Sequence, residues 1–311
     1  NQVNSGVDAG TSNNSKRFYG IYQPISGTHT FGTNDSLNEL STFLNKISQG
    51  GICGPVVIKL RNGNYTNDFD FELINTLGTS ATNTITIESE SGNRGDVLLR
   101  PDNSYNYGVF EFRNTKYVTL RNFTIDGNDI QEPTLYLSGS CDYLTLDNMI
   151  LLGDSNQNDD NIYVDNFING LTMNNCYVYG GETGIESYGD DDAAPINITN
   201  CEFINQDEYG CEFGEHKYVR IHNNRFVSNI NSSYLGYFEY NSTFIFTNNY
   251  VLADSADNQE VMYFYYNNDH GTGICNISNN YFGGFDDPDA VVYYQSSTPG
   301  IFANNTIVSD A

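Results

Sequence analysis

Carboxylate and tyrosine side chains recur at one position of a repeated pattern, each flanked by apolar residues. If side chains alternate between the two faces of a strand, the outward series is Glu111, Tyr136, Tyr163, Glu186, Glu212, Glu239, Tyr265 and Tyr293. Glycoside hydrolysis requires two carboxyl groups, which Glu186, Glu212 and Glu239 could supply from neighbouring segments. Tyrosine combines an apolar ring with a polar tip, so the candidate ligand-binding residues are Tyr136, Tyr163, Tyr265 and Tyr293.

Three interpretations of this series are open. The carboxylates could be the catalytic groups of a glycoside hydrolase or polysaccharide lyase, the series could bind a glycan without catalysis, or it could be a solvated strand face. The chain contains no nucleophile-elbow, Walker or dinucleotide motif. The residue before His270 is Asp269, where polygalacturonases have glycine. Whether the protein is an enzyme stays uncertain, and the sequence favours binding over catalysis.

Acidic loops form a second group of candidate residues. Calcium prefers six to eight oxygen ligands, and stacked loops could offer them through Asp159, Asp160, Asp190, Asp191 and Asp192. None of these loops has the spacing of an EF-hand. The sequence therefore indicates calcium as the candidate cofactor, and no other.

The charge of the chain restricts its partners. Lys and Arg total 13 against 39 Asp and Glu, which gives a formal net charge of −26. Nucleic acids and anionic membrane surfaces attract basic proteins, so neither is expected as a partner, and polyuronates are disfavoured for the same reason. No stretch approaches the ~20 apolar residues of a membrane span. A polysaccharide or cell-surface glycan is the expected ligand.

A repeat determines which elements must position these residues. The pattern Val118, Leu120, Asn122, Ile125 returns along the chain with its asparagine at Asn148, Asn175, Asn200, Asn223, Asn248, Asn279 and Asn305, at spacings of 23 to 31 residues. Each unit fits one coil of three short strands, with the asparagine at a corner. Coils stacked ~4.8 Å apart would align these side chains as an asparagine ladder. The repeat predicts an all-β, right-handed parallel β-helix.

Solenoids need covered ends. Residues 34–49 combine a capping-box spacing with apolar residues at helical intervals, followed by Gly50 and Gly51, which predicts a capping helix over the first coil. Residues 1–16 are expected to form a flexible polar tail, and 17–311 a single β-helix domain. No second cap is visible, so we expect a truncated C-terminus and contacts with other domains of a longer chain.

The six cysteines show no zinc-ligand spacing. Small buried side chains are the expected role of most of them, and disulfides are the alternative for an exported protein. Pairing of Cys176 with Cys201 across adjacent coils stays open.

Three segments, residues 50–65, 78–93 and 117–125, resemble secreted right-handed β-helix repeat proteins of Bacteroidota type. These belong to the pectate-lyase-like superfamily, which includes polysaccharide-degrading enzymes and adhesins. The resemblance covers residues 25–311 and implies a secreted or cell-surface location. Together with the composition, it predicts an extracellular, non-catalytic module that binds glycans or surfaces, or serves as a rigid spacer. The alternative is a polysaccharide-degrading enzyme that uses stacked glutamates.

Overall fold

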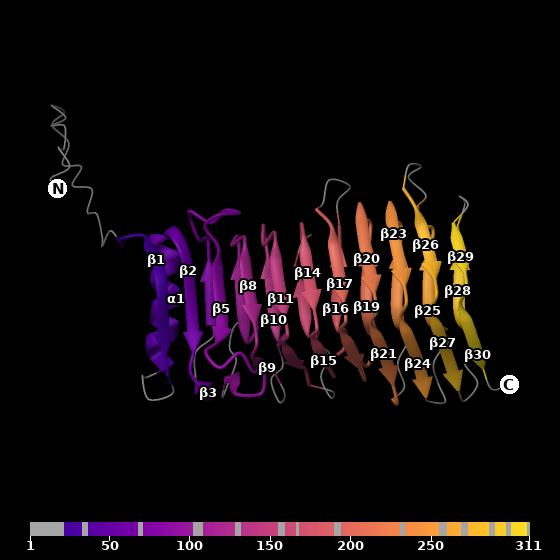
Figure 1. Cartoon of the computed structure of the whole chain (residues 1–311), viewed down its shortest axis with the longest axis horizontal. Coiled ribbons are helices and arrows are strands. Elements are labelled where there is room, and N and C mark those ends of the chain that lie inside the picture. Colours follow the sequence, from indigo (N-terminus) through magenta and orange to yellow (C-terminus); the bar gives the residue numbers. More distant parts are fainter. Residues whose placement is uncertain are drawn as a thin grey trace, which may run out of the picture.

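The chain winds as a parallel β-helix in which each complete coil adds one strand to each of three sheets (Figure 1). The computed structural model describes residues 22–32, 37–67, 71–101, 108–127, 132–154, 159–165, 168–189, 194–230, 234–254, 260–268, 273–285, 290–296 and 300–309. Paired strands run parallel throughout these ranges, as in β11 with β14 and β24 with β27. The predicted parallel β-helix with one short helix is confirmed.

Sheet A consists of β1 (Ile25–Phe31), β2 (Ile52–Leu60), β5 (Ile85–Ser89), β8 (Val118–Arg121), β11 (Leu144–Asp147), β14 (Leu171–Asn174), β17 (Ile196–Thr199), β20 (Tyr218–His222), β23 (Thr243–Thr247), β26 (Cys275–Ser278) and β29 (Ile301–Ala303). Sheet B consists of β3 (Gly63–Asn67), β6 (Val97–Pro101), β9 (Thr124–Asp126), β12 (Ile150–Leu152), β15 (Tyr177–Tyr179), β18 (Glu202–Ile204), β21 (Arg225–Ser228), β24 (Tyr250–Asp254), β27 (Tyr281–Phe285) and β30 (Thr306–Ser309). Sheet C consists of β4 (Phe71–Ile74), β7 (Phe110–Arg113), β10 (Leu135–Ser138), β13 (Ile162–Val164), β16 (Ile185–Tyr188), β19 (Tyr209–Gly214), β22 (Tyr234–Glu239), β25 (Glu260–Tyr265) and β28 (Ala290–Gln295).

Asparagine turns the chain at the corner between sheets A and B. The corner residues all have φ between 53° and 63°: Asn122, Asn148, Asn175, Asn200, Asn223, Asn248, Asn279 and Asn304. Asparagine adopts this left-handed conformation more readily than most other residues. The side chains of Asn148 and Asn175 each donate to the preceding rung, at 2.9 and 2.8 Å. The predicted ladder is therefore present from Asn122 to Asn175 and from Asn200 to Asn223, whereas the Asn200 side chain donates to Asn174 between these two runs. The last corner residue is Asn304 and not Asn305.

The residue after each corner forms a second, buried row. In the C-terminal coils this inner row is Asn224, Asn249, Asn280 and Asn305, and Asn249 is 2% exposed. Each Nδ2 donates to a backbone carbonyl, as Asn249 does to Ile221 at 3.0 Å. Each Oδ1 accepts the backbone N–H of the preceding rung, as Asn249 does from Asn224 at 2.8 Å. Because residues 304 and 305 are both asparagine, residue type alone does not show which of them is the corner residue. The pairing of β26 with β29 aligns Ala303 with Ser278, so Asn304 corresponds to the corner residue Asn279 and Asn305 belongs to the inner row.

Apolar side chains fill the interior of the solenoid. Phenylalanines stack along it, with the rings of Phe203 and Phe226 5.0 Å apart and those of Phe238 and Phe264 5.7 Å apart. Five of the six cysteines are buried, as predicted, and Cys53 is exposed. All six are free thiols in this structure. The Cys201 sulfur accepts the backbone N–H of Cys176 at 3.4 Å. Cys176 and Cys201 therefore occupy the inner-row position on the two coils before Asn224, where they take the place of asparagine.

The predicted capping helix is α1 (Leu37–Gly50), which lies at the N-terminal end of the solenoid (Figure 1). Leu40, Leu44 and Ile47 are buried on its inner face. Gly51 ends the helix at φ 71°, and its N–H donates to the Ile47 carbonyl at 2.8 Å. A side chain there would lie 2.6 Å from the Leu77 carbonyl oxygen, so glycine is required.

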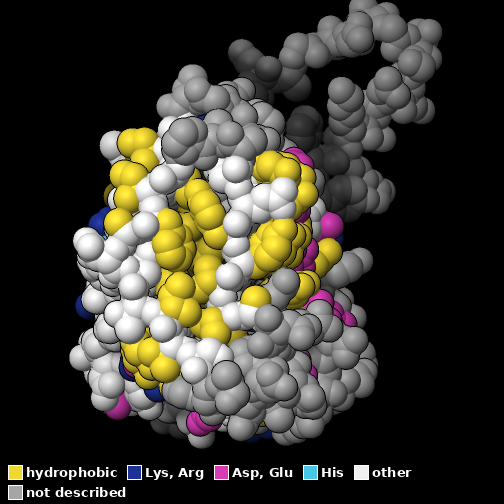
Figure 2. Space-filling view, turned by 90° about the vertical axis from the view of Figure 1, so that its right-hand side faces the viewer, with side chains coloured by type: hydrophobic (Ala, Val, Ile, Leu, Met, Phe, Trp, Pro, Cys, Tyr) yellow, Lys and Arg dark blue, Asp and Glu magenta, His cyan; other side chains and the backbone are white. Residues whose placement is uncertain are grey.

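At the opposite end, hydrophobic side chains gather on the surface (Figure 2). They include Ile301, which is 51% exposed, and Phe302 on β29, with Ile307 and Val308 on β30. No described element covers these strands. The predicted tail falls within residues 1–21, which lie outside the described residues, and truncation after Ala311 stays a prediction. No helix of the described residues is long and apolar enough to cross a membrane.

Candidate functional site

The outer face of sheet C carries a continuous row of carboxylates and tyrosines, one from each strand. Pairing of the strands defines this outer row as Glu72, Glu111, Tyr136, Tyr163, Glu186, Glu212, Tyr237, Tyr263 and Tyr293. Six of the predicted residues lie in it. Glu239 and Tyr265 do not, because they belong to a parallel second row with Tyr188, Gly214 and Gln295.

The prediction was wrong at β22 because Gly236 occupies an inward position, and at β25 because Met262, its partner on the next coil, does. Gly236 pairs with the buried Cys211, and Tyr237 therefore pairs with Glu212. A Cβ on Gly236 would lie 2.7 Å from the Met262 Cε and from the Phe238 ring, so neighbouring side chains fill the space that an apolar residue would otherwise take. A glycine in an inward position does not look like part of an apolar alternation, so the pattern predicts an outward residue two positions too far along the chain.

Tyrosines in the outer row stack on one another. The Tyr263 ring lies 4.6 Å from Tyr237 and 4.7 Å from Tyr293, each at 8° between ring planes. Both faces of Tyr263 are therefore covered, and this end of the row offers ring edges and hydroxyls. Tyr136 is 8% exposed, stacks 5.7 Å from Tyr163, and donates its hydroxyl to Asp165 at 2.9 Å. These stacked rings stiffen the surface of the sheet and leave few ring faces on which a ligand could pack.

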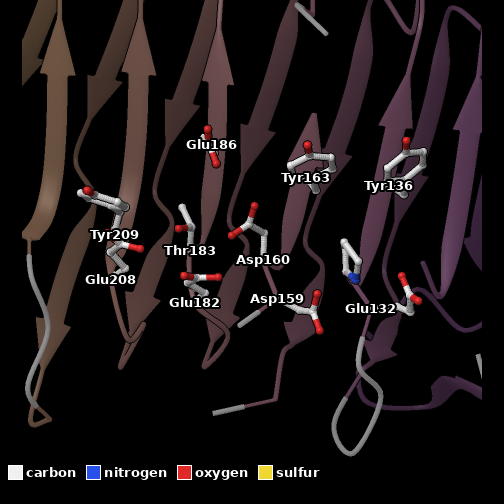
Figure 3. A pocket seen from close by; sticks show the side chains of 11 residues that line it. Glu132, Tyr136, Asp159, Asp160, Tyr163, Glu182, Thr183, Glu186, Glu208 and Tyr209 are labelled. Atoms are coloured by element: carbon white, nitrogen blue, oxygen red, sulfur yellow. The ribbon is translucent and has the colours of Figure 1, made fainter. Parts of the chain in front are cut away.

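A groove of about 350 Å³ crosses the outer face of sheet C where the tyrosine row is interrupted (Figure 3). Its volume falls within the usual range of ligand sites. It is lined by Glu132, Pro133, Tyr136, Asp159, Asp160, Tyr163, Glu182, Thr183, Glu186, Glu208 and Tyr209. We call this cavity the acidic groove.

Two aromatic rings line the acidic groove, and each stacks on another ring on one side only. Tyr163 stacks on Tyr136 on one side, and its partner on the other side is Glu186. Tyr209 stacks 5.5 Å from Tyr234 on one side, and its partner on the other side is Thr183. Tyr163 and Tyr209 thus face the same intervening coil, two coil steps or roughly 10 Å apart along the axis. Their positions along the strands differ, so the space between them runs diagonally across the sheet.

Buried carboxyl groups line the groove between these rings. Asp160 is 8% exposed, and burial together with the neighbouring Glu186 charge raises the pKa of its carboxyl to about 7, while hydrogen bonds from Thr183 oppose the shift. Burial, then repulsion from Glu208, raises the pKa of Glu186. Burial and the adjacent Glu208 likewise raise the pKa of Glu182. Near neutral pH, Asp160 is therefore partly protonated.

The other two predicted catalytic residues lie outside the groove lining. Glu212 follows Glu186 in the outer row, and it accepts a hydrogen bond from the Tyr188 hydroxyl. Burial is the main cause that raises the pKa of Glu212 to about 7, and the Tyr188 hydrogen bond opposes the shift. Glu239 accepts from the Tyr237 hydroxyl at 3.1 Å in the second row. The three glutamates are therefore not one equivalent series.

The predicted metal ligands divide into two groups. Asp159 and Asp160 line the acidic groove, whereas Asp190, Asp191 and Asp192 lie outside the described residues. Within the described ranges, no group of three or more His, Cys, Asp or Glu side chains is arranged to hold a metal ion. Calcium binding therefore stays a prediction.

Several groove residues were missed from the sequence, among them Glu132, Glu182 and Glu208. Together with Asp159, which was predicted only as a metal ligand, they occupy corresponding positions on consecutive coils, each four residues before the outer row. This recurrence of acidic residues was the available signal. Tyr209 gave none, because only the pairing of β16 with β19 shows which coil its ring faces.

No family profile and no curated protein matches this chain. Among solved structures it is similar to a PL6 family alginate lyase, AlyGC, with a TM-score of 0.41 and 12% sequence identity. The alignment covers 92% of this chain and 40% of the lyase chain. The chain thus spans well under half of that protein's length, and likeness at this level assigns neither an activity nor a substrate.

Proposed function

We propose that this chain is a secreted or cell-surface β-helix that binds a glycan in the acidic groove, without catalysis. The observation that carries the proposal is the pair of tyrosines that line the groove, Tyr163 and Tyr209, which lie on either side of one coil and have no stacked ring on the side toward it. Sugar rings pack their apolar faces on aromatic side chains, while carboxylates and hydroxyls accept and donate hydrogen bonds at their rims.

The stiffness of the solenoid supports a binding role. Four of the groove side chains project from the consecutive strands β10, β13, β16 and β19, whose backbones pair in register, and the other lining residues lie in the segments directly before these strands. Sites on paired strands hold their geometry better than sites on loops. Little ordering of the protein is then required on binding, which leaves more of the contact energy as affinity.

The tyrosine walls give the first prediction. Tyr163→Ala and Tyr209→Ala should each weaken glycan binding at least about tenfold, which corresponds to the ~1.4 kcal/mol expected for loss of one aromatic contact. The measurement is isothermal titration calorimetry against soluble polysaccharides that the wild-type protein retains in affinity electrophoresis. Tyr250→Ala is the control, because Tyr250 is exposed and stacks 4.9 Å from Tyr281 on sheet B. Unchanged affinity in both groove variants would contradict the proposal.

A second function is favoured by one specific observation. Asp160, with a pKa of about 7, lies in the same groove as Glu186, and Figure 3 shows both side chains directed into it. A protonated carboxyl beside an ionised one is the arrangement that glycoside hydrolysis uses for its acid and its base or nucleophile. In this alternative, Asp160 is the acid and Glu186 the second carboxylate, in place of the predicted Glu212 and Glu239.

Product analysis distinguishes the two functions. If the protein is a hydrolase, mass spectrometry should detect defined oligosaccharides released from a bound polysaccharide, and Asp160→Asn and Glu186→Gln should each lower the rate at least about 100-fold. Glu212→Gln should retain activity, because Glu212 does not line the groove. Release that persists in both groove variants would rule out this mechanism, and no release at all leaves binding as the function. Added calcium tests the predicted cofactor in the same assay.

A further inference from the structure

We propose that the acidic groove selects glycans that carry protonated amino groups, such as glucosamine-containing chains. This inference rests on glycan binding as the function and adds the charge class of the ligand. It stands on the combination of a cavity, two aromatic rings that each stack on one side only, and the kind of side chain between them.

The charged lining of the groove has one sign. The described lining contains no Lys, Arg or His. Six of its eleven residues carry carboxyl groups: Glu132, Asp159, Asp160, Glu182, Glu186 and Glu208. The guanidinium of Arg113 lies one coil before Tyr136, where it pairs with Glu111 and is 5.8 Å from the Tyr136 ring centre. An anionic sugar would meet only repulsion here, whereas a cation would be attracted.

Some carboxylates elsewhere on this protein have basic partners. Arg121 and Lys59 contact Glu88, Lys116 contacts Asp142, and Arg225 contacts Glu202. With 13 basic residues against 39 acidic ones, many carboxylates must lie without such a partner. Within the described residues, Glu182, Glu186 and Glu208 of the groove have no ion pair with Lys or Arg. They are also partly buried, which makes their mutual repulsion stronger than on an open surface.

A bound ammonium group would relieve this repulsion. Burial and like charges raise the pKa of Asp159, Asp160, Glu182 and Glu186, and Asp160, with a pKa of about 7, holds a proton near neutral pH that a bound cation would displace. The faces of Tyr163 and Tyr209 add a further attraction, because the negative face of an aromatic ring favours a cation within about 6 Å. A pyranose ring between the tyrosines with an amino group toward Glu182 and Glu186 would use both kinds of contact.

Three tetrasaccharides of equal length test the charge class by calorimetry at pH 6: a glucosamine, an N-acetylglucosamine and a galacturonate tetramer. We expect the glucosamine tetramer to bind at least about tenfold more tightly than its neutral N-acetyl form, and the galacturonate tetramer most weakly. The preference should shrink between 50 and 500 mM NaCl, because salt screens charge attraction. Binding should also release protons, visible as a dependence of the measured heat on the ionisation enthalpy of the buffer.

Variants of groove residues test whether the preference for the glucosamine tetramer arises in the acidic groove. Glu182→Gln with Glu208→Gln should reduce the ratio of glucosamine to N-acetylglucosamine affinity to below about threefold. Glu202→Gln is the matched control, because Glu202 is a carboxylate on sheet B that pairs with Arg225 outside the groove, and its ratio should equal that of wild type.

The outcomes separate the two proposals. Equal binding of the cationic and neutral tetramers, or tighter binding of galacturonate, would overturn the charge class and leave glycan binding in place. A preference that persists in the double variant would overturn the assignment to this groove. Displacement of the glucosamine tetramer by 1 mM calcium, with calcium itself binding, would show a metal site instead. No binding of any tetramer or polysaccharide would overturn glycan binding as well.

Discussion

Replacing Asn249 with alanine should destabilise the protein by about 2–4 kcal/mol, whereas replacing its neighbour Asn248 with glycine should change stability by less than about 1 kcal/mol. Asn249 lies in the inner row at 2% exposure. Its Oδ1 accepts the backbone N–H of Asn224 at 2.8 Å, and its Nδ2 donates to Ile221 and Asn280. Truncation leaves the buried Asn224 N–H without its acceptor and opens a cavity the size of a carboxamide.

The control is chemically matched, because the two residues are identical and adjacent. Asn248 is exposed, and its role is the turn at φ 58°, a conformation that glycine adopts without strain. Chemical unfolding followed by circular dichroism measures the global difference. Hydrogen exchange at the Asn224 amide measures the local one, since solenoids can open coil by coil. Equal losses in the two variants, or a protected Asn224 amide in Asn249→Ala, would show that the inner row is not a stabilising element.

The second large effect concerns His216, which occupies an asparagine position in another buried row. Asn241 and Asn267 follow it on the next two coils, and its backbone N–H donates to the Asn241 Oδ1 at 3.0 Å. The imidazole is fully buried, with Nε2 3.0 Å from the Ser187 carbonyl oxygen and Nδ1 without a partner among the described residues. Burial lowers the pKa of His216 to about 4, and the contact with Ser187 opposes the shift.

This pKa predicts an acid-sensitive fold. In the unfolded chain a histidine binds its proton near pH 6.5, whereas the folded protein keeps His216 neutral down to about pH 4. The stability is therefore complete above pH 6.5 and falls as the pH drops from 6.5 to 4, by about 3 kcal/mol, with no further loss below pH 4. His216→Asn should remove this dependence, because asparagine can make the bonds that Asn241 and Asn267 make at the equivalent positions.

The measurement is the free energy of unfolding of wild type and His216→Asn at pH 7.5, 6, 5 and 4. Asp160 and Glu212, whose raised pKa values favour the fold at lower pH, act in the opposite direction, but they are common to both proteins and cancel in the difference. His222→Asn is the control. Burial also lowers the pKa of His222, but this side chain is only half-buried and should give a smaller dependence. Parallel pH profiles for wild type and His216→Asn would refute the prediction.

The two unfolding predictions and the binding predictions concern different parts of one architecture. Inward residues set the spacing and orientation of the coils, and outward residues of sheet C form the acidic groove on that frame. A variant such as Asn249→Ala lies on the inner row and far along the chain from β16. It should lower stability without altering the ratio of cationic to neutral glycan affinity, since the two readouts depend on separate contacts.

The sequence by itself determined the local and repeated features. Alternating apolar residues, corner asparagines and the spacing between them are properties of consecutive residues, so they specified a coil, a parallel β-helix and the cap that became α1. The same pattern placed Glu186, Glu212, Tyr136 and Tyr163 in one outward row, as the structure has them.

Only the tertiary structure decided what depends on contacts between coils. Gly236 shifts β22 so that Tyr237, and not Glu239, continues the row. Tyr163 and Tyr209, from coils two steps apart, line one groove because the coil between them places Glu186 and Thr183, and no aromatic ring, beside them. The pKa of Asp160 rises because burial and the Glu186 charge come from a neighbouring strand. Burial and electrostatic repulsion are set by residues distant in the chain, and the register of stacked strands determines which of them meet.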